Sequence, residues 1–126
     1  MRLLLDTATF LYAVESPERL SKRASAVLRN QANILELSAI SLAEIAIKAA
    51  LGKLSISEEI AQQSLDDLDI RVLPYTAAHA FQLFTLPRHH SDPFDRQIIA
   101  QALSEGVAVV TPDEMFELYR GLKIVW

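Results

Sequence analysis

Short apolar runs alternate with longer amphipathic segments along the chain. Four of these runs end at a polar residue or a proline, which is typical of strands buried on both faces of a parallel sheet. They span residues 3–5, 34–38, 70–73 and 107–110, and a fifth run spans residues 123–126. We therefore predict five strands.

Segments with a 3.6-residue apolar period join these runs and predict helices between the strands. Ser41 precedes one segment and Glu44 follows it at the spacing of a capping box, so we expect this helix to begin at Ser41 and to stop at Gly52. Asp92 is expected to cap the longest helix, which Gly106 closes. Further helices are expected to begin at Thr7, Ser21, Ser57, Thr76 and Glu114.

The alternation of strands and helices predicts an α/β fold with three layers. Parallel neighbouring strands need crossover connections, and the helices of these connections cover both faces of the sheet. The chain has 126 residues, 51% of them hydrophobic, which is enough to bury a core, and no repeat or linker divides it. We therefore expect a single domain over residues 1–126.

The charge composition argues against a simple nucleic-acid coat protein. The chain has 16 acidic and 12 basic residues and a net charge of −4, whereas such a protein is usually basic. Four basic residues do lie in one stretch, and a solvated helix face explains them better than a phosphate-binding patch does. These residues are Arg19, Lys22, Arg23 and Arg29.

The sequence has no cysteine, which excludes disulfides and thiolate metal ligands. No stretch resembles a secretion signal, and none approaches the ~20 apolar residues that cross a bilayer. We therefore expect a cytoplasmic protein that has no membrane partner.

Four acidic residues lie where the predicted topology brings side chains together. Asp6 follows the first strand and Asp113 follows the fourth. Glu44 and Asp95 lie about one turn into helices that start at the same edge of the sheet, and ligands of open α/β sheets bind at this edge. Carboxylates at short range raise each other's pKa, so the cluster requires a counter-charge. Mg²⁺ or Mn²⁺ is the cation that carboxylates and water suit best.

Each acid also has a simpler explanation. Asp6 ends a strand, and Asp113 is placed to cap the helix that follows it. Asp95 complements a helix dipole, and Glu44 has a partner either in its capping box or in Lys48, four residues later. Taken singly, these explanations are at least as good as a metal site. Four such coincidences at one sheet edge favour the metal site.

Several motifs, in this order and at this chain length, resemble those of PIN-domain proteins of the VapC type, the ribonuclease half of bacterial and archaeal toxin–antitoxin pairs. The resemblance covers essentially the whole chain. Its pieces are Leu3-Leu4-Leu5-Asp6-Thr7, Ser41-Leu42-Ala43-Glu44-Ile45-Ala46-Ile47-Lys48 with Leu51-Gly52-Lys53-Leu54, Leu86-Pro87 through His90, Asp92-Pro93-Phe94-Asp95-Arg96, Ile99-Ala100-Gln101-Ala102, and Val110-Thr111-Pro112-Asp113 with Phe116.

The resemblance implies a metal-dependent endoribonuclease built on a central five-stranded parallel sheet flanked by helices. The family's metal ligands, which hold one or two Mg²⁺ or Mn²⁺ ions, map onto Asp6, Glu44, Asp95 and Asp113. Its supporting hydroxyl maps onto Thr111, and Thr7 follows the first acid. The resemblance also implies an RNA substrate, a cognate antitoxin and a homodimer. Apolar surface for sharing is expected at Phe10, Leu11, Tyr12 and in the region 57–84.

Two acidic residues are candidates for the third metal-ligand position. Asp92 and Asp95 are three residues apart and therefore share a helix face. Asp95 precedes Asp113 by 18 residues, which is the spacing that the resemblance implies, and it lies inside the first turn. We therefore expect Asp95 to be the ligand and Asp92 to be the helix cap.

The histidines suggest a rival chemistry, in which a histidine base cleaves RNA without metal. His89 and His90 lie in a loop expected to be exposed, where a histidine is more often plain polar surface than a catalytic base. Contact with RNA phosphate, together with Arg88 and Arg96, is the alternative role for them. His79 lies among apolar residues of a helix and is expected to be structural.

Three other classes of protein compete with the nuclease. A PIN-like module that only binds a partner is disfavoured by the intact acids. A phospho-receiver domain requires an acid at the end of a middle strand, where this chain has Pro74-Tyr75. A phosphatase with an Asp-x-Asp motif is disfavoured because Thr7-Ala8 follows Asp6.

Overall fold

The computed structural model describes all residues, Met1–Trp126, and places five parallel strands in one sheet. The order across the sheet is β3-β2-β1-β4-β5, so the first strand is central. This confirms the predicted α/β fold with its five-stranded parallel sheet. The strands are β1 (Arg2–Leu5), β2 (Ile34–Ser38), β3 (Ile70–Leu73), β4 (Ala108–Val110) and β5 (Ile124–Val125).

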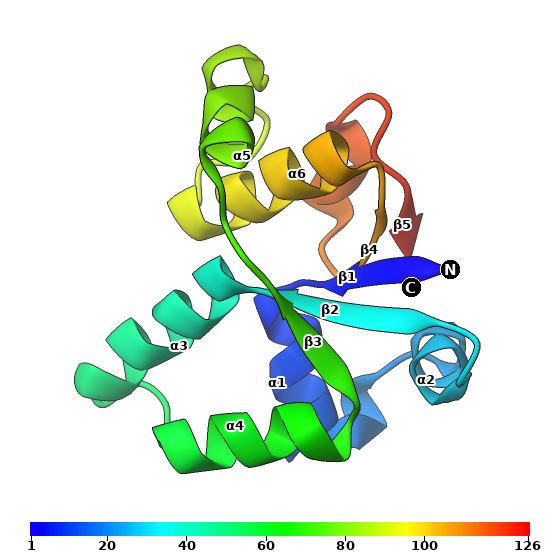
Figure 1. Cartoon of the computed structure of the whole chain (residues 1–126), viewed down its shortest axis with the longest axis vertical. Helices are drawn as coiled ribbons and strands as arrows, with labels where there is room; N and C mark the ends of the chain where they lie inside the picture. The colour runs from blue at the N-terminus through cyan, green and yellow to red at the C-terminus, as the bar shows by residue number, and fades with distance from the viewer.

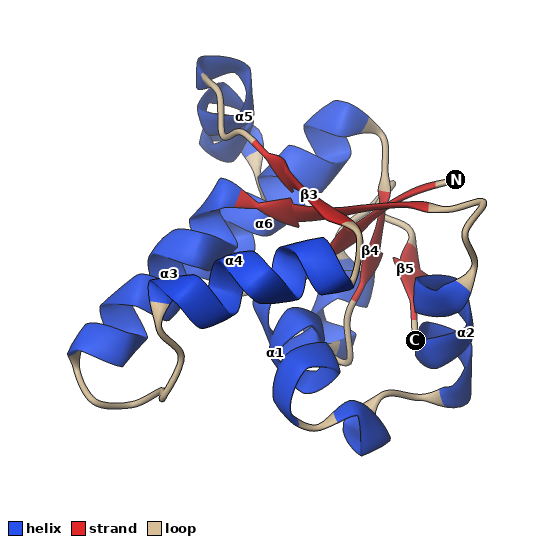
Figure 2. Cartoon of the chain, turned by 60° about the horizontal axis from the view of Figure 1, so that its bottom comes forward, coloured by secondary structure: helices blue, strands red, loops and turns tan.

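Helices cover both faces of the sheet, as three layers require (Figures 1 and 2). One face carries α1 (Thr7–Glu15), α2 (Lys22–Arg29), α3 (Ala39–Ala50) and α4 (Glu58–Asp67). The other carries α5 (Ala77–Gln82) and α6 (Pro93–Glu105). Three short 3₁₀ helices complete the chain: η1 (Pro17–Arg19), η2 (Leu83–Thr85) and η3 (Glu114–Leu118).

The apolar run of β1 is explained by its central place. Leu3 and Leu5 pack into the core on the α1 side, whereas Leu4 packs into the core on the α6 side. All three are fully buried, and each contributes roughly 1.5–3 kcal/mol of apolar burial. A strand covered on both faces has no reason to alternate polar and apolar residues.

The sheet order also fixes where the chain leaves the core. Leu5 and Val110 are register partners at the carboxyl ends of β1 and β4. The Asp6 amide donates a hydrogen bond to the Val110 carbonyl, at 3.1 Å. The residues that follow these two strands therefore emerge side by side at one edge.

The start of α3 differs from the prediction. Ser38 caps the helix by accepting the Ile40 amide at 3.0 Å, so the helix begins at Ala39 and the capping box expected at Ser41 is wrong. The physical reason is that β2 runs into α3 without a loop, so that the last strand residue must cap the first turn. Ser41 is instead fully buried and accepts a hydrogen bond from the Thr7 hydroxyl.

The predicted apolar surface is only partly present. Phe10 is fully buried in the core, so its expected place on a shared surface is wrong. In the 57–84 region, Phe81 and Phe84 are 68% and 84% exposed and stack on each other.

None of the helices combines the length and the apolar character that crossing a membrane requires.

His79 is structural, as predicted. It is 2% exposed, and its Nδ1 accepts the amide of Thr76 in a capping box at the start of α5. Its Nε2 pairs with Glu105 at 2.9 Å, and Arg2 joins Glu105 to Glu36. This network ties α5 and α6 to the start of β1.

Candidate metal centre

Asp6 is held by donors on two sides. It is the N-cap of α1, where its Oδ1 accepts the Thr9 amide at 2.8 Å, and its Oδ2 accepts the Thr111 hydroxyl at 2.6 Å. The carboxyl group is 3% exposed, and burial raises its pKa in spite of these donors. Thr9, which the sequence did not single out, also donates its hydroxyl to the Val110 carbonyl. The position of Asp6 is thus fixed by the ends of both β1 and β4.

Thr111 connects two of the acids. Its hydroxyl donates to Asp6 and accepts the Asp113 amide at 3.0 Å. Asp113 is the N-cap of η3, and its Oδ1 accepts the Met115 amide. The cap expected for this short helix is therefore present, and the Thr111 hydroxyl contacts both Asp6 and Asp113.

Replacement of Thr111 by valine is expected to destabilise the protein by about 1–3 kcal/mol, because it removes a donor from buried Asp6 and leaves the Asp113 amide without its partner. The measurement is urea unfolding at pH 8 in the presence of a chelator. Thr85→Val, at an exposed position of η2, is the matched control and is expected to change little. Equal stability of the two variants would contradict this account of Thr111.

Glu44 enters the site from the middle of α3. It is 4% exposed, and its Oε2 accepts from Lys48 Nζ at 2.6 Å, the (i, i+4) pair that the sequence allowed. Its Oε1 is buried and has no hydrogen-bond partner. The bond from Thr7 to Ser41 fastens α1 to α3 just before Glu44. A buried carboxylate oxygen without a partner is costly, and a cation would satisfy it.

Asp95 lies in the first turn of α6. Asp92 caps this helix, as predicted, and its Oδ1 accepts the amides of Phe94 and Asp95. Burial raises the pKa of Asp95 to about 7, and the negative charges of Asp92, Asp6 and Glu44 act in the same direction. A carboxyl group in this state gains from a nearby divalent cation.

The structure brings all four predicted acids to one pocket. Its volume is about 210 Å³, and its polar lining also includes Thr7, Lys48 and Asp92. The remaining lining residues are Asp6, Ala8, Leu11, Glu44, Asp95 and Asp113.

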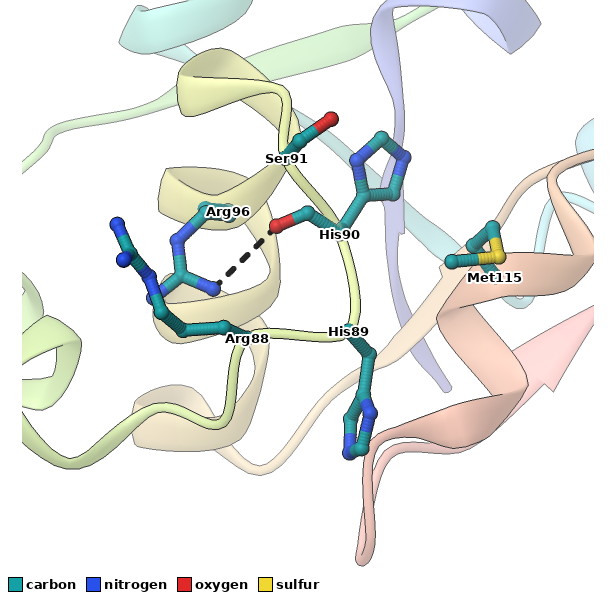
Figure 3. Close-up of a pocket in the computed structure, with 6 residues that line it drawn as sticks. All are labelled: Arg88, His89, His90, Ser91, Arg96 and Met115. Atoms are coloured by element: carbon teal, nitrogen blue, oxygen red, sulfur yellow. Dashed lines mark hydrogen bonds between the residues drawn. The ribbon is translucent and has the colours of Figure 1, made fainter.

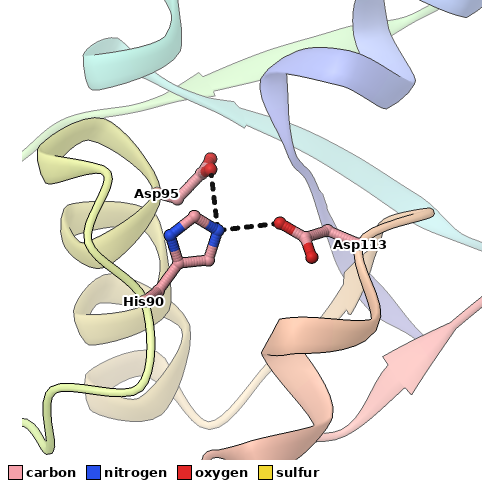
Figure 4. Close-up of side chains that lie close together, drawn as sticks. All are labelled: His90, Asp95 and Asp113. Carbon is pink, nitrogen blue, oxygen red and sulfur yellow. Dashed lines mark hydrogen bonds and ion pairs between the residues drawn. The ribbon is translucent and has the colours of Figure 1, made fainter.

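The exposed position predicted for His90 is wrong. We expected it on an exposed loop, but its side chain is 13% exposed and points between two of the acids (Figure 4). Its Nε2 lies 2.7 Å from Asp113 Oδ2 and 3.2 Å from Asp95 Oδ2. No signal in the local sequence indicates this, because the loop is positioned by contacts with distant residues.

The other three predicted RNA contacts line a neighbouring pocket of about 540 Å³ beside His90. Arg88 and His89 are exposed. Arg96 is turned back on its own loop and donates to the carbonyls of Leu86, Pro87 and His90. Arg96 therefore holds the loop, which leaves Arg88 and His89 as the exposed groups.

The donor set fits a hard divalent cation. Oxygen ligands predominate, one buried carboxylate oxygen has no partner, and the facing atoms of His90, Asp95 and Asp113 lie within 4.8 Å of one another. Mg²⁺ and Mn²⁺ prefer such sites. Five acids line this small pocket. Only two basic side chains form ion pairs with them: Lys48 contacts Glu44, and His90 contacts Asp95 and Asp113.

The fold is that of a PIN domain. The PIN domain family model matches residues 3–122, so the chain belongs to this family. The PIN-domain part of the resemblance seen in the sequence is thereby confirmed, and the receiver-domain alternative is set aside.

Similar solved structures have the same fold. VapBC2 from Rickettsia felis, bound to a DNA fragment from its promoter, has a TM-score of 0.74 and 20% identity over 98% of this chain and 97% of that chain. DNA-bound VapBC from Salmonella typhimurium has a TM-score of 0.73 and 21% identity, over 98% and 96%. VapBC-5 from Mycobacterium tuberculosis, of a family of toxin–antitoxin systems, has a TM-score of 0.61 and 20% identity, over 98% and 96%. A search of curated protein sequences gave no match.

Proposed function

We propose that this protein is a metal-dependent endoribonuclease and the toxin of a toxin–antitoxin pair. The observation that carries the proposal is the pocket in which four acids from two helices and two strand ends meet, with a buried Glu44 oxygen that has no partner. Membership in the PIN family and the VapBC relatives support the same reading.

The acids have distinct roles in this proposal. Asp6, Asp95 and Asp113 hold one or two Mg²⁺ or Mn²⁺ ions, and Glu44 contributes directly or through a water. A bound ion of this kind lowers the pKa of water and offsets charge on phosphoryl oxygens. Thr111 keeps the Asp6 carboxylate turned toward the pocket by its 2.6 Å hydrogen bond.

The reaction is hydrolysis of an RNA phosphodiester. A water oxygen bonds to phosphorus as the bond from phosphorus to the 3′-oxygen breaks, so the products carry a 5′-phosphate and a 3′-hydroxyl. A proton from solvent goes to the departing 3′-oxygen, and Asp6 or Glu44 accepts the proton of the attacking water. Both are almost fully buried, which keeps bulk water from screening the site.

The RNA strand is proposed to enter over the pocket beside the acids (Figure 3). Arg88 and His89 offer exposed donors for phosphate, and the exposed Met115 side chain offers an apolar surface for a base. His90 lines this pocket and touches Asp113, so the pocket adjoins the acidic centre. A cytoplasmic location follows from the proposed substrate.

The proposed antitoxin has a surface to bind. An apolar groove of about 480 Å³ lies between α3 and α4, and α3 also lines the acidic pocket through Glu44 and Lys48. A segment with apolar side chains and one basic residue would fill the groove and reach the acids. Co-purification with the product of a neighbouring small open reading frame tests this partner, and its loss in an Ala46→Glu variant tests the groove. The proposed homodimer is tested by light scattering.

The test of the enzyme is cleavage of structured RNA and of a DNA of the same sequence. Purified protein with Mg²⁺ or Mn²⁺ is expected to cut only the RNA, to leave 5′-phosphates, and to stop when a chelator is added. Cleavage that resists the chelator would revive metal-free histidine chemistry. Antitoxin binding without any cleavage would identify a PIN module that only binds a partner.

A further inference from the structure

His90 is built into its position from three sides. Its backbone amide donates to the Tyr119 hydroxyl at 2.7 Å, and its ring packs against the Phe116 ring in a T-shaped arrangement. Its Nδ1 accepts the amide of Asp92 at 3.1 Å. The ring therefore cannot turn freely, although it belongs to a loop.

These contacts determine which ring nitrogen carries the proton. A backbone amide can only donate, so the bond from Asp92 requires a lone pair on His90 Nδ1. We therefore assign the proton of the neutral ring to Nε2. Nε2 faces Oδ2 of both Asp113 and Asp95. An ionised carboxylate oxygen can only accept a hydrogen bond, so both oxygens accept from the Nε2–H group. One N–H group is thus shared between two carboxylates.

We propose that His90 is a positioning residue of the metal centre, whose Nε2–H group holds Asp95 and Asp113 in the arrangement that a divalent ion requires. The proposal rests on the metal centre proposed above. Two carboxylates whose facing oxygens lie within 4.8 Å repel each other. A shared hydrogen-bond donor offsets this repulsion and fixes the orientation of both carboxylates. Asp113 is then held at both oxygens, because its Oδ1 accepts from Met115.

A direct ligand role for His90 is disfavoured by the same geometry. Coordination through Nε2 requires that nitrogen to lose its proton and Nδ1 to gain one. The hydrogen bond from the Asp92 amide to Nδ1 would then be lost. Groups that hydrogen-bond to ligating carboxylates act by orienting them, and their removal typically weakens metal binding by about 10–100-fold.

The experiment is a titration of the purified protein with Mn²⁺, followed by electron paramagnetic resonance and by calorimetry. His90→Ala is expected to weaken Mn²⁺ binding by about 10–100-fold. His90→Gln is expected to recover most of the affinity, because its side-chain amide places an N–H group near the position of Nε2. Gln63→Ala, at an exposed position of α4, is the control and is expected to bind Mn²⁺ as the wild type does.

Each other outcome overturns a defined part of the proposal. Unchanged binding in His90→Ala, or binding in His90→Gln as weak as in His90→Ala, excludes positioning through the N–H group. A ¹⁴N hyperfine coupling from a coordinated imidazole, seen by pulsed resonance in the wild type and absent from His90→Gln, replaces positioning by ligation. Failure of the wild type to bind Mn²⁺ at all overturns the metal centre itself, and RNA cleavage is then tested separately.

Discussion

Replacing Asp6 by asparagine is expected to abolish RNA cleavage and to stabilise the metal-free protein. The loss of activity follows because the carboxylate is a central acid of the pocket, and Asn cannot supply its charge to a divalent ion. A metal ion stabilises a transition state by several kcal/mol, and each 1.36 kcal/mol corresponds to a tenfold change in rate. The expected fall in cleavage rate is therefore about 100–1000-fold or more.

The gain in stability follows from the burial of the same group. Asp6 is 3% exposed and its pKa is raised mainly by burial, so that its ionised form is costly in the folded state. The Asn amide oxygen can still accept the Thr9 amide, and the Thr111 hydroxyl can accept from the Asn nitrogen. We expect a higher melting temperature for Asp6→Asn than for the wild type at pH 8 with a chelator.

The matched control is Asp66→Asn, which makes the same chemical change at an exposed position of α4. It is expected to leave both RNA cleavage and melting temperature close to those of the wild type. Cleavage by Asp6→Asn at the wild-type rate would remove Asp6 from the mechanism. A lower melting temperature in Asp6→Asn would show that its hydrogen bonds outweigh the cost of burying its charge.

The sequence was sufficient to predict which acids meet. Asp6 and Asp113 follow apolar runs, and the carboxyl ends of parallel strands face one edge of a sheet. The pairing of β1 with β4 then places Leu5 beside Val110 and brings the two acids together. Local patterns of this kind depend on the backbone period, which a sequence displays directly.

The contacts that the sequence did not reveal depend on residues far along the chain. His90 reaches the acids because Tyr119 and Phe116, more than 20 residues later, hold its backbone and its ring. Arg96 was expected to contact RNA, but its loop offers three carbonyls that it satisfies. Contacts of this kind depend on tertiary packing, which leaves no periodic pattern in the sequence.

Helix capping shows the same limit at short range. Ser41 was the expected cap because Glu44 follows it at the spacing of a capping box, but a serine at position 38 can cap a helix equally well. The structure uses Ser38 because the chain turns into α3 at the last residue of β2. Ser41 and Glu44 are thereby released to face α1 and the pocket.

The stability of the metal-free protein is expected to fall as the pH rises from about 5 to 8. The pKa of Asp95 is raised from its ordinary value of 3.8 to about 7, so between these values the folded state keeps a proton that the unfolded state has lost. Folding is then favoured by low pH, and this contribution is lost as the pH rises through about 7. The raised pKa of Asp6 acts in the same direction. Glu105 has a lowered pKa and acts only below its ordinary value of 4.5, outside this range.

A divalent ion is expected to reverse this trend, because it binds the ionised carboxylates that proton loss creates. At 100 times its dissociation constant, an ion stabilises the folded state by about 2.7 kcal/mol, which for a chain of this size raises the melting temperature by roughly 10 °C. The measurement is a set of melting curves from pH 5 to 8, with Mn²⁺ or with a chelator. The Mn²⁺ effect is expected to be large at pH 8 and small at pH 5, where Asp95 is protonated. Asp95→Asn is expected to flatten the pH dependence and to lose most of the Mn²⁺ effect. An equal effect of Mn²⁺ at both pH values would show that the ion binds elsewhere.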